Sequence, residues 1–91
     1  MSATPPPDLI LYTRPGCGLC DETRDLLTSL LAERAIVGRR VPTIVERDIE
    51  TDPSWEREFF ALIPVVELAD RRLELATSAL KLRRFLSAAL D

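Results

Sequence analysis

The sequence predicts a small α/β fold: one four-stranded mixed sheet with helices on both faces, and elements in the order β-α-β-α-β-β-α. Short apolar runs suited to buried strands alternate with segments whose apolar residues recur at helical spacing. The 91 residues are enough for about one small domain. Apolar residues make up 46% and charged residues 30% of the chain, which is typical of a compact globular protein. We therefore place a single domain at residues 8–91, after a flexible, proline-rich lead-in at residues 1–7.

The first half of the domain is predicted to form a strand, a helix and a second strand. Leu9–Tyr12 is a short apolar run between proline-containing segments, as expected of a buried strand. From Leu19 onward apolar residues recur at helical spacing, and this helix should end before Gly38. Residues 43–49 follow a proline and are rich in β-branched side chains, which favours a strand. Two strands joined through a helix should lie parallel, with a right-handed crossover.

A shorter helix and a hairpin should follow. Asp52 suits an N-cap position, and the proline after it suits the first position of a helix that Pro64 would stop. Val65–Leu68 and Arg72–Leu75 flank a three-residue turn, so we expect an antiparallel hairpin in the same sheet. A last helix would begin after Thr77 or Ser78 as its N-cap. Its buried side chains would be Leu82, Phe85, Leu86 and Ala89.

Charge and hydropathy exclude several classes of partner. The net charge is −3 and the sequence pI is about 4.9, so the field of the protein would repel a phosphate backbone. No apolar run approaches the length of a membrane span, and the first residues do not resemble a signal peptide. We therefore expect no nucleic-acid partner and no membrane association. Two cysteines close together do not resemble a secreted disulfide scaffold, so we expect a cytoplasmic protein.

The chain contains no histidine, which narrows its chemistry. Ser/His/Asp and Cys/His catalysis are excluded, and the commonest ligand of transition metals is missing. A structural zinc site normally takes four Cys or His ligands, and the sequence offers two. The remaining reactive groups are thiols, carboxylates, hydroxyls and basic side chains.

The sequence Cys17-Gly18-Leu19-Cys20 lies between the first strand and the first helix. A thiol at a helix N-terminus faces unpaired N–H groups and the positive end of the helix dipole, which lowers its pKa. Arg14 would add a positive charge, whereas neighbouring carboxylates oppose it. Cys20 would lie about one turn further in, shielded but close enough for a disulfide. We therefore predict Cys17 as the attacking thiolate and Cys20 as the resolving thiol of a disulfide reductase, with no cofactor required.

Other interpretations of the pair stay open. The two thiols could be small buried hydrophobes, or the clip of a metal or iron-sulfur carrier completed by carboxylates or by a second chain. The domain could also be a redox-inactive adaptor that uses the same surface. The position of the pair after a strand, within a β-α-β pattern, favours the redox interpretation.

Tyr12–Cys20 resembles the active-site segment of the glutaredoxins and the related glutaredoxin-like proteins of the thioredoxin fold. That family has a basic residue and a proline just ahead of the first cysteine. Ile63-Pro64-Val65 is similar to the family's cis-proline loop, where the peptide bond before proline is cis and the preceding backbone pairs with the bound substrate. The resemblance covers residues 9–90 in element order. It implies a thioredoxin-like fold and thiol-disulfide exchange.

The sequence departs from that family at two places. Gly18-Leu19 replaces the usual Pro-Tyr, and Glu74–Ser78 replaces a Gly-Gly-Asp-type segment that binds glutathione. The substrate implied is a disulfide-containing protein or a low-molecular-weight thiol, with glutathione or a reductase as electron donor. The replaced segment argues against glutathione, although N–H groups at the start of the last helix would suit a carboxylate. The residues expected to support the cysteines or bind substrate are Tyr12, Arg14, Pro15, Ile63, Pro64, Thr77 and Ser78.

Overall fold

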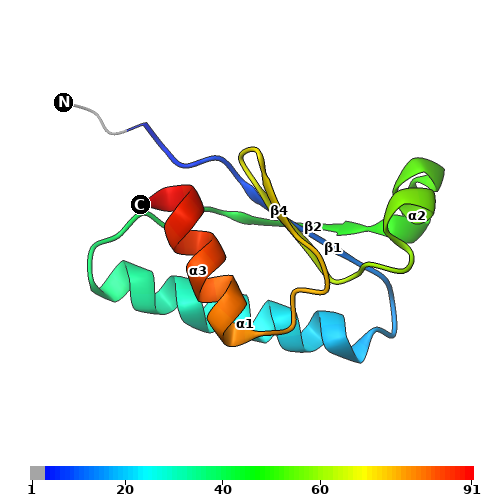
Figure 1. The fold of residues 1–91 in the computed structure, drawn as a ribbon, viewed down its shortest axis with the longest axis horizontal. Coiled ribbons are helices and arrows are strands. Elements are labelled where there is room, and N and C mark those ends of the chain that lie inside the picture. Colours follow the sequence, from blue (N-terminus) through cyan, green and yellow to red (C-terminus); the bar gives the residue numbers. More distant parts are fainter. Residues whose placement is uncertain (1–3) are drawn as a thin grey trace.

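The computed structural model describes residues 4–91 and contains one sheet with strand order β2-β1-β3-β4 (Figure 1). The strands are β1 (Leu9–Thr13), β2 (Ile44–Asp48), β3 (Val65–Leu68) and β4 (Arg71–Leu73), and the helices are α1 (Gly18–Ile36), η1 (Ile49–Thr51), α2 (Pro53–Phe59) and α3 (Ala79–Leu90). The predicted element order and mixed sheet are confirmed, and only the 3-10 turn η1 was not predicted. Residues 4–8 form neither helix nor strand. Residues 1–3 of the predicted lead-in lie outside the described residues, and its flexibility stays a prediction.

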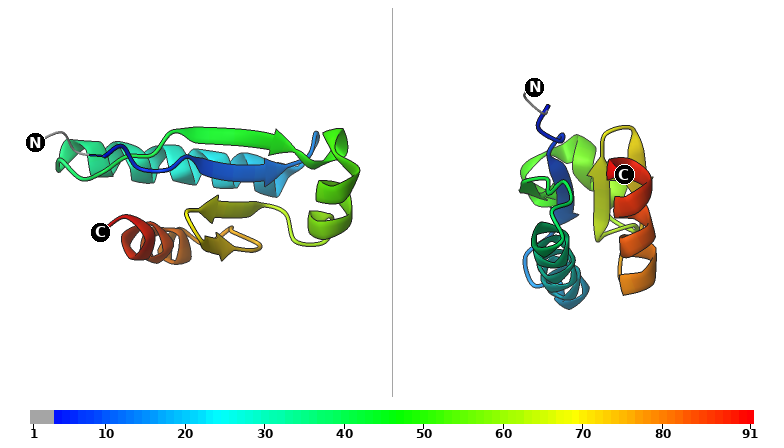
Figure 2. Two further views of the ribbon diagram at one scale, coloured as in Figure 1. Left: turned by 90° about the horizontal axis from the view of Figure 1, so that it is seen from above. Right: turned by 90° about the vertical axis from the view of Figure 1, so that its left-hand side faces the viewer.

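The strand β1 lies inside the sheet and pairs with neighbours of opposite sense. It is parallel to β2, with Thr13 opposite Asp48 at their last residues, and antiparallel to β3. The helix α1 supplies the crossover between the two parallel strands, as predicted. Because parallel strands end at the same edge of a sheet, the carboxyl ends of β1 and β2 meet where α1 begins. Figure 2 shows β1 and β2 side by side with α1 along them.

Side chains alternate along β1 between two faces of the sheet, and each face has its own core. Leu9 and Leu11 are fully buried on the face that α1 and α3 cover. That core also contains Leu27, Leu30, Leu31, Val66, Leu68, Ala76, Leu82, Leu86 and Leu90. Burial of each leucine side chain contributes about 2 kcal/mol, so this larger core provides most of the apolar stabilisation.

The helix α2 and the short 3-10 turn η1 pack against the opposite face of the sheet. Tyr12, Ile49, Phe59 and Val65 form a second buried cluster there. Figure 1 shows α2 at one end of the sheet, near the connection from β1 to α1. Helices therefore cover both faces, as predicted. The helix α2 lies at the end of the sheet where β1 connects to α1.

The helix α1 follows the predicted apolar spacing. Thr23, Leu27, Leu30 and Leu31 are buried, and Leu26 packs against the core from a partly buried position. The helix ends at Ile36, and Gly38 adopts a left-handed backbone with φ +74° while its N–H donates to the Ala35 carbonyl. Glycine reaches this conformation without steric cost, which explains the stop before Gly38. No helix within residues 4–91 is long and apolar enough to span a membrane.

The hairpin differs from the prediction in its register. Leu68 pairs with Arg71, so the turn contains two residues rather than three, and β4 ends at Leu73 instead of Leu75. Ala69 takes a left-handed φ of 56°, a conformation that the usual Asn-Gly signal would have marked. The chain leaves the sheet after Leu73 because the N–H of Leu75 donates to the Leu62 carbonyl at 2.9 Å.

The boundaries of the two shorter helices are set by caps. Asp52 caps α2 as predicted, with its carboxylate accepting the Ser54 N–H at 2.8 Å. The helix ends at Phe59, and a turn separates it from Pro64, so the proline does not itself stop the helix. Of the two predicted caps for α3, Ser78 is the one used, and its hydroxyl accepts the Lys81 N–H at 3.2 Å.

Candidate functional site

The two cysteines form a disulfide at the start of α1. Their Cα atoms lie 5.2 Å apart. Cys17 is partly exposed, whereas Cys20 is completely buried. Solvent therefore reaches the pair through Cys17, which has the accessibility expected of an attacking thiol.

A tight turn brings Cys17 from the end of β1 to the start of α1. Pro15 and Gly16 are its two central residues, and Gly16 has φ +73°. Proline followed by a glycine with positive φ is the sequence signature of a type II turn. A Cβ atom at position 16 would meet no atom within 4 Å, so backbone conformation rather than space selects glycine there. The turn holds Arg14 and Cys17 close together as its first and last residues.

Cys17 is itself the N-cap residue of α1. Its backbone is extended, with φ −94° and ψ 104°, and its Sγ accepts the backbone N–H of Cys20 at 3.1 Å. The carbonyl of Cys17 accepts the N–H of Asp21 at 3.1 Å, which is the first hydrogen bond of the helix. After reduction, the same sulfur would lie against N–H groups and the positive end of a 19-residue helix. This environment favours a thiolate.

The peptide bond between Ile63 and Pro64 is cis, as the resemblance implied. The N–H of Ile63 already donates to the Phe59 carbonyl at 3.1 Å. Within residues 4–91 no backbone donor occupies the Ile63 carbonyl. Of the two backbone groups of Ile63, the carbonyl is therefore the one left for the pairing with substrate that the resemblance implied.

The loop before α3 is tied to both the cis-proline turn and α1. The N–H of Ala76 donates to the Pro64 carbonyl at 2.9 Å. The Thr23 hydroxyl, which is fully buried, donates to the Ala76 carbonyl at 2.6 Å. Sequence reasoning placed Thr23 only in the apolar face of α1; a hydroxyl one turn after Cys20 on a buried face was the signal for this contact. The loop consequently lies beside the first turns of α1.

Thr77 and Ser78 do not form an open row of N–H donors. The N–H of Thr77 donates to the Leu75 carbonyl at 2.8 Å, and the Ser78 side chain is occupied as the cap of α3. The two N–H groups that sequence reasoning offered for a carboxylate are thus reduced to one. Ser78 therefore acts as the N-cap of α3.

Tyr12 lies on the α2 face of the sheet. Its ring stacks on Phe59 with centroids 4.2 Å apart and meets the edge of Trp55 at 5.9 Å. Its hydroxyl donates to Glu67 Oε1 at 3.1 Å and accepts from Arg47 at 3.0 Å. Burial raises the pKa of Tyr12, so the hydroxyl stays protonated at neutral pH. Tyr12, one residue before the last residue of β1, therefore packs the sheet against α2 and has a structural role.

Arg14 points toward α2. Its Nη2 lies 3.4 Å from Glu56 Oε1, and both side chains are partly exposed. Arg14 Nε and Glu56 Oε2 are buried and have no hydrogen-bond partner within residues 4–91. A buried polar atom without a partner costs about 1–3 kcal/mol, so this ion pair is poorly satisfied.

Carboxylates and guanidinium groups surround the turn before Cys17. A cavity of about 300 Å³ borders Pro15 and Gly16, and its charged lining residues are Arg14, Asp21, Arg24, Glu46 and Asp48. Arg24 donates to Asp21 at 2.8 Å and to Glu46 at 3.0 Å. The hydrogen bond from Arg24 holds the pKa of Glu46 below its usual value. The guanidinium of Arg24 is therefore already engaged by two carboxylates.

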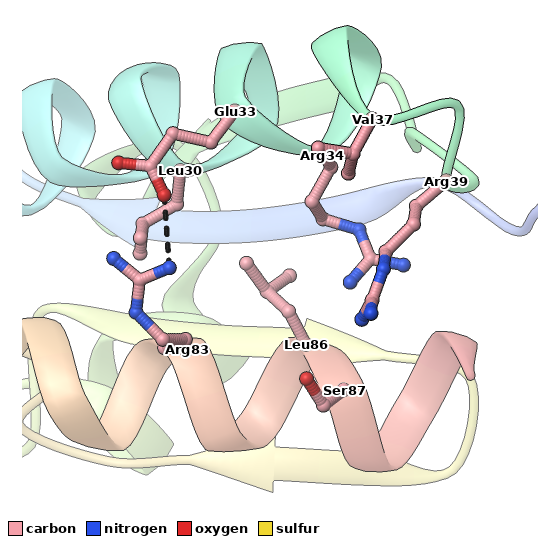
Figure 3. Close-up of a pocket in the computed structure, with 8 residues that line it drawn as sticks. All are labelled: Leu30, Glu33, Arg34, Val37, Arg39, Arg83, Leu86 and Ser87. Carbon is pink, nitrogen blue, oxygen red and sulfur yellow. Dashed lines mark hydrogen bonds and ion pairs between the residues drawn. The ribbon is translucent and has the colours of Figure 1, made fainter.

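A second groove, of about 290 Å³, lies between α1 and α3 at the opposite end of α1 (Figure 3). Its lining includes three arginines, which are ion-paired within the chain: Arg83 with Glu33, and Arg34 and Arg39 with Asp91. The groove contains no thiol. The disulfide is therefore the candidate functional site.

No group of three or more Cys, Asp or Glu side chains in residues 4–91 is arranged to hold a metal ion. A metal or iron-sulfur site built on the cysteines would need ligands from another molecule. The alternative interpretation as a metal carrier gains no support from the described residues.

Comparisons with known proteins agree with this geometry. The profile of a family described as "Glutaredoxin-like domain" matches residues 8–88. A structural genomics target protein, XcR50 from X. campestris, has 28% identity and a TM-score of 0.72, over 89% of this chain and 97% of that chain. A solved structure described as a malarial protein has 16% identity and a TM-score of 0.65, over 97% of this chain and 100% of that chain, and it shows similarity of fold alone. The search of curated proteins found no match.

Proposed function

Because the chain belongs to the glutaredoxin-like family, we propose that it is a dithiol oxidoreductase that reduces disulfides with Cys17 and Cys20. The observation that carries this proposal is the disulfide at the N-cap of α1, with one sulfur accessible and the other buried. A thiol-redox role fits both the family and the Cys17–Cys20 pair. The substrate, the electron donor and the roles of the individual residues form the rest of the proposal.

The reaction begins with the dithiol form. The Cys17 thiolate attacks one sulfur of the substrate disulfide, forms a mixed disulfide, and releases the other substrate sulfur as a thiolate that takes up a proton. Cys20 then loses its proton and attacks the Cys17 sulfur. This step releases the second substrate thiol and leaves the Cys17–Cys20 disulfide. A donor dithiol supplies two electrons to reduce that disulfide and is itself oxidised to a disulfide.

We propose a protein disulfide as the substrate. Leu19 lies between the two cysteines, and Leu75 lies in the loop bonded to the cis-proline turn; each is more than half exposed. Together with the partly buried Ile63, they are apolar side chains on the segments that carry the disulfide and the cis-proline turn. Such a surface suits apolar side chains beside a disulfide in a protein or peptide.

We propose a protein thiol, supplied by a reductase, as the electron donor. Glutathione carries two carboxylates, which need positive groups or free N–H donors. Beside the turn, Asp21, Glu46 and Asp48 face only Arg14 and Arg24, and the N–H of Thr77 is already used. These features disfavour glutathione by charge and by hydrogen bonding. A reducing cytoplasm would keep such a donor pool available, and we propose that compartment as the site of action.

A disulfide-reductase assay tests the proposal. The protein is supplied with insulin as substrate, and with either glutathione plus glutathione reductase or a thioredoxin reductase system as donor. We expect turnover with the reductase system, little with glutathione, and none for Cys17→Ser. An inactive wild-type protein in both systems would exclude the oxidoreductase function, whereas faster turnover with glutathione would overturn the proposed donor.

A further inference from the structure

We propose that Glu56 is a positioning residue that holds Arg14 against α2 in the disulfide form and competes with the Cys17 thiolate for that guanidinium after reduction. This inference deepens the proposed function and rests on it. Glu56 lies on α2, far from Cys17 in sequence, and its ion pair with Arg14 connects it to the turn before Cys17. Glu56 would therefore control whether the Arg14 guanidinium lies against α2 or beside Cys17.

Arg14 is close enough to serve either partner. Arg14 and Cys17 are the first and last residues of the turn centred on Pro15 and Gly16. The Cα atoms at the ends of a β-turn lie within about 7 Å of each other. An arginine side chain spans a similar distance, so rotation about its own bonds can bring the guanidinium from Glu56 to the sulfur of Cys17.

The ion pair between Arg14 and Glu56 is weak enough for the guanidinium to move to Cys17. It consists of one contact at 3.4 Å, longer than a well-formed charge-assisted hydrogen bond. Arg14 Nε and Glu56 Oε2 are buried and find no hydrogen-bond partner in the part of the chain that the structure describes, so neither group is fully satisfied by the other. A disulfide sulfur is uncharged and offers the guanidinium little. A thiolate is charged and competes for it.

Of the two guanidinium groups that line the cavity beside the turn, Arg14 is the one left available to Cys17. Arg24 on α1 is bound by Asp21 of the same helix and by Glu46 of β2. Asp48, at the end of β2, accepts the N–H of Glu50 at 2.9 Å. The carboxylates Asp21, Glu46, Asp48 and Glu56 all oppose ionisation of a nearby thiol. Of these, Glu56 is the one ion-paired with Arg14.

Removal of the Glu56 charge should therefore release Arg14 to Cys17. An opposite charge at close range lowers a thiol pKa by about 1–3 units, and partial exposure places this case near the lower end. We expect Glu56→Gln to lower the Cys17 pKa by roughly one unit, and Arg14→Ala to raise it. Since a lower pKa also reduces the nucleophilicity of a thiolate, alkylation well below the pKa should accelerate by only about threefold.

The experiment measures the pH profile of iodoacetamide alkylation of Cys17 in the fully reduced protein. Glu58→Gln is the matched control, because Glu58 lies on the same helix, is similarly exposed and is paired with Arg72 rather than Arg14. We expect the Glu56→Gln profile to shift to lower pH and the Glu58→Gln profile to match the wild type. An unshifted profile for Glu56→Gln would overturn the proposal.

A double-mutant cycle separates positioning from a direct effect of the Glu56 charge. If Glu56 acts through Arg14, Glu56→Gln should not shift the profile in the Arg14→Ala background, and Arg14→Lys should keep part of the shift. An equal shift in both backgrounds would show that Glu56 acts on the thiol directly, and would reject the positioning role. The alkylation profile needs no substrate, so this result is independent of the reductase assay that tests the proposed function.

Discussion

The hydroxyl of Thr23 donates a hydrogen bond of 2.6 Å to the Ala76 carbonyl, and both residues are buried. The contact joins α1, one turn after the second cysteine, to the loop that follows the hairpin. The same loop is bonded to the cis-proline turn through the N–H of Ala76. One side chain thus links two segments of the candidate site that are 53 residues apart.

Thr23→Val should destabilise the protein by about 1–3 kcal/mol, because it keeps the side-chain shape but leaves a buried carbonyl without a partner. Urea unfolding followed by circular dichroism measures the change. Thr28→Val is the matched control: its hydroxyl donates to the Arg24 carbonyl at 2.9 Å on the exposed side of the same helix. The control should change stability by less than about 0.5 kcal/mol. Equal losses for the two variants would contradict a special role for Thr23.

Cys20→Ser should trap a mixed disulfide between Cys17 and a protein substrate. The first step needs only Cys17, whereas release of the substrate needs the buried second sulfur. Incubation with a disulfide substrate, followed by non-reducing electrophoresis and mass spectrometry, measures the adduct. Cys17→Ser serves as the control and should form none. Recovery of adduct on Cys20 but not on Cys17 would reverse the proposed roles.

Leu75→Ser should lower kcat/KM for reduction of a protein disulfide while leaving reduction of a small disulfide unchanged. Burial of an exposed leucine against a partner contributes on the order of 1 kcal/mol, which corresponds to about a fivefold loss. Insulin and hydroxyethyl disulfide provide the two substrates. Ile36→Ser is the control, since Ile36 is 84% exposed at the far end of α1. A parallel loss with both substrates would argue against an apolar docking role.

Acid should weaken the contact between Arg24 and Glu46. The pKa of Glu46 is held below its ordinary 4.5, chiefly by the hydrogen bond from Arg24. A lowered folded-state pKa means that the stabilisation is present above about pH 4.5 and is lost as the pH falls through the folded value. Because both side chains are more than a third exposed, the effect should be below about 1 kcal/mol.

Stability measured against pH for Glu46→Gln and Glu50→Gln tests this expectation. Glu50 forms no ion pair within residues 4–91 and serves as the control. The acid loss of stability should be smaller in Glu46→Gln than in the control. If both variants lose the same free energy of unfolding as the pH falls, protonation of Glu46 does not contribute to the acid loss of stability.

The strands, the helices and the position of the cysteine pair could be predicted because local signals specify them. Apolar spacing, the Asp52 cap and Gly38 mark elements through backbone preferences that act within a few residues. The position of Cys17 followed from the same signals, since the turn residues Pro15 and Gly16 come directly before it. These parts of the structure need no knowledge of distant contacts.

Features that depend on contacts between distant segments, or on an unusual backbone conformation, could not be predicted from local signals. The hairpin register depends on a left-handed Ala69, which no common turn signal marks. The departure from the sheet after Leu73 depends on the bond between Leu75 and Leu62, and the direction of Arg14 depends on Glu56. For Leu75 and Arg14, a partner distant in sequence decides between local conformations of similar energy.

The complete burial of Cys20 behind a partly exposed Cys17 has a kinetic consequence. In the proposed reaction, the substrate disulfide and the donor dithiol must both react with the same sulfur, so they cannot bind productively at the same time. One partner has to depart before the other arrives, as in a ping-pong scheme, and double-reciprocal plots at several donor concentrations would be parallel lines. The single accessible sulfur would thus set the order of steps in the proposed reaction.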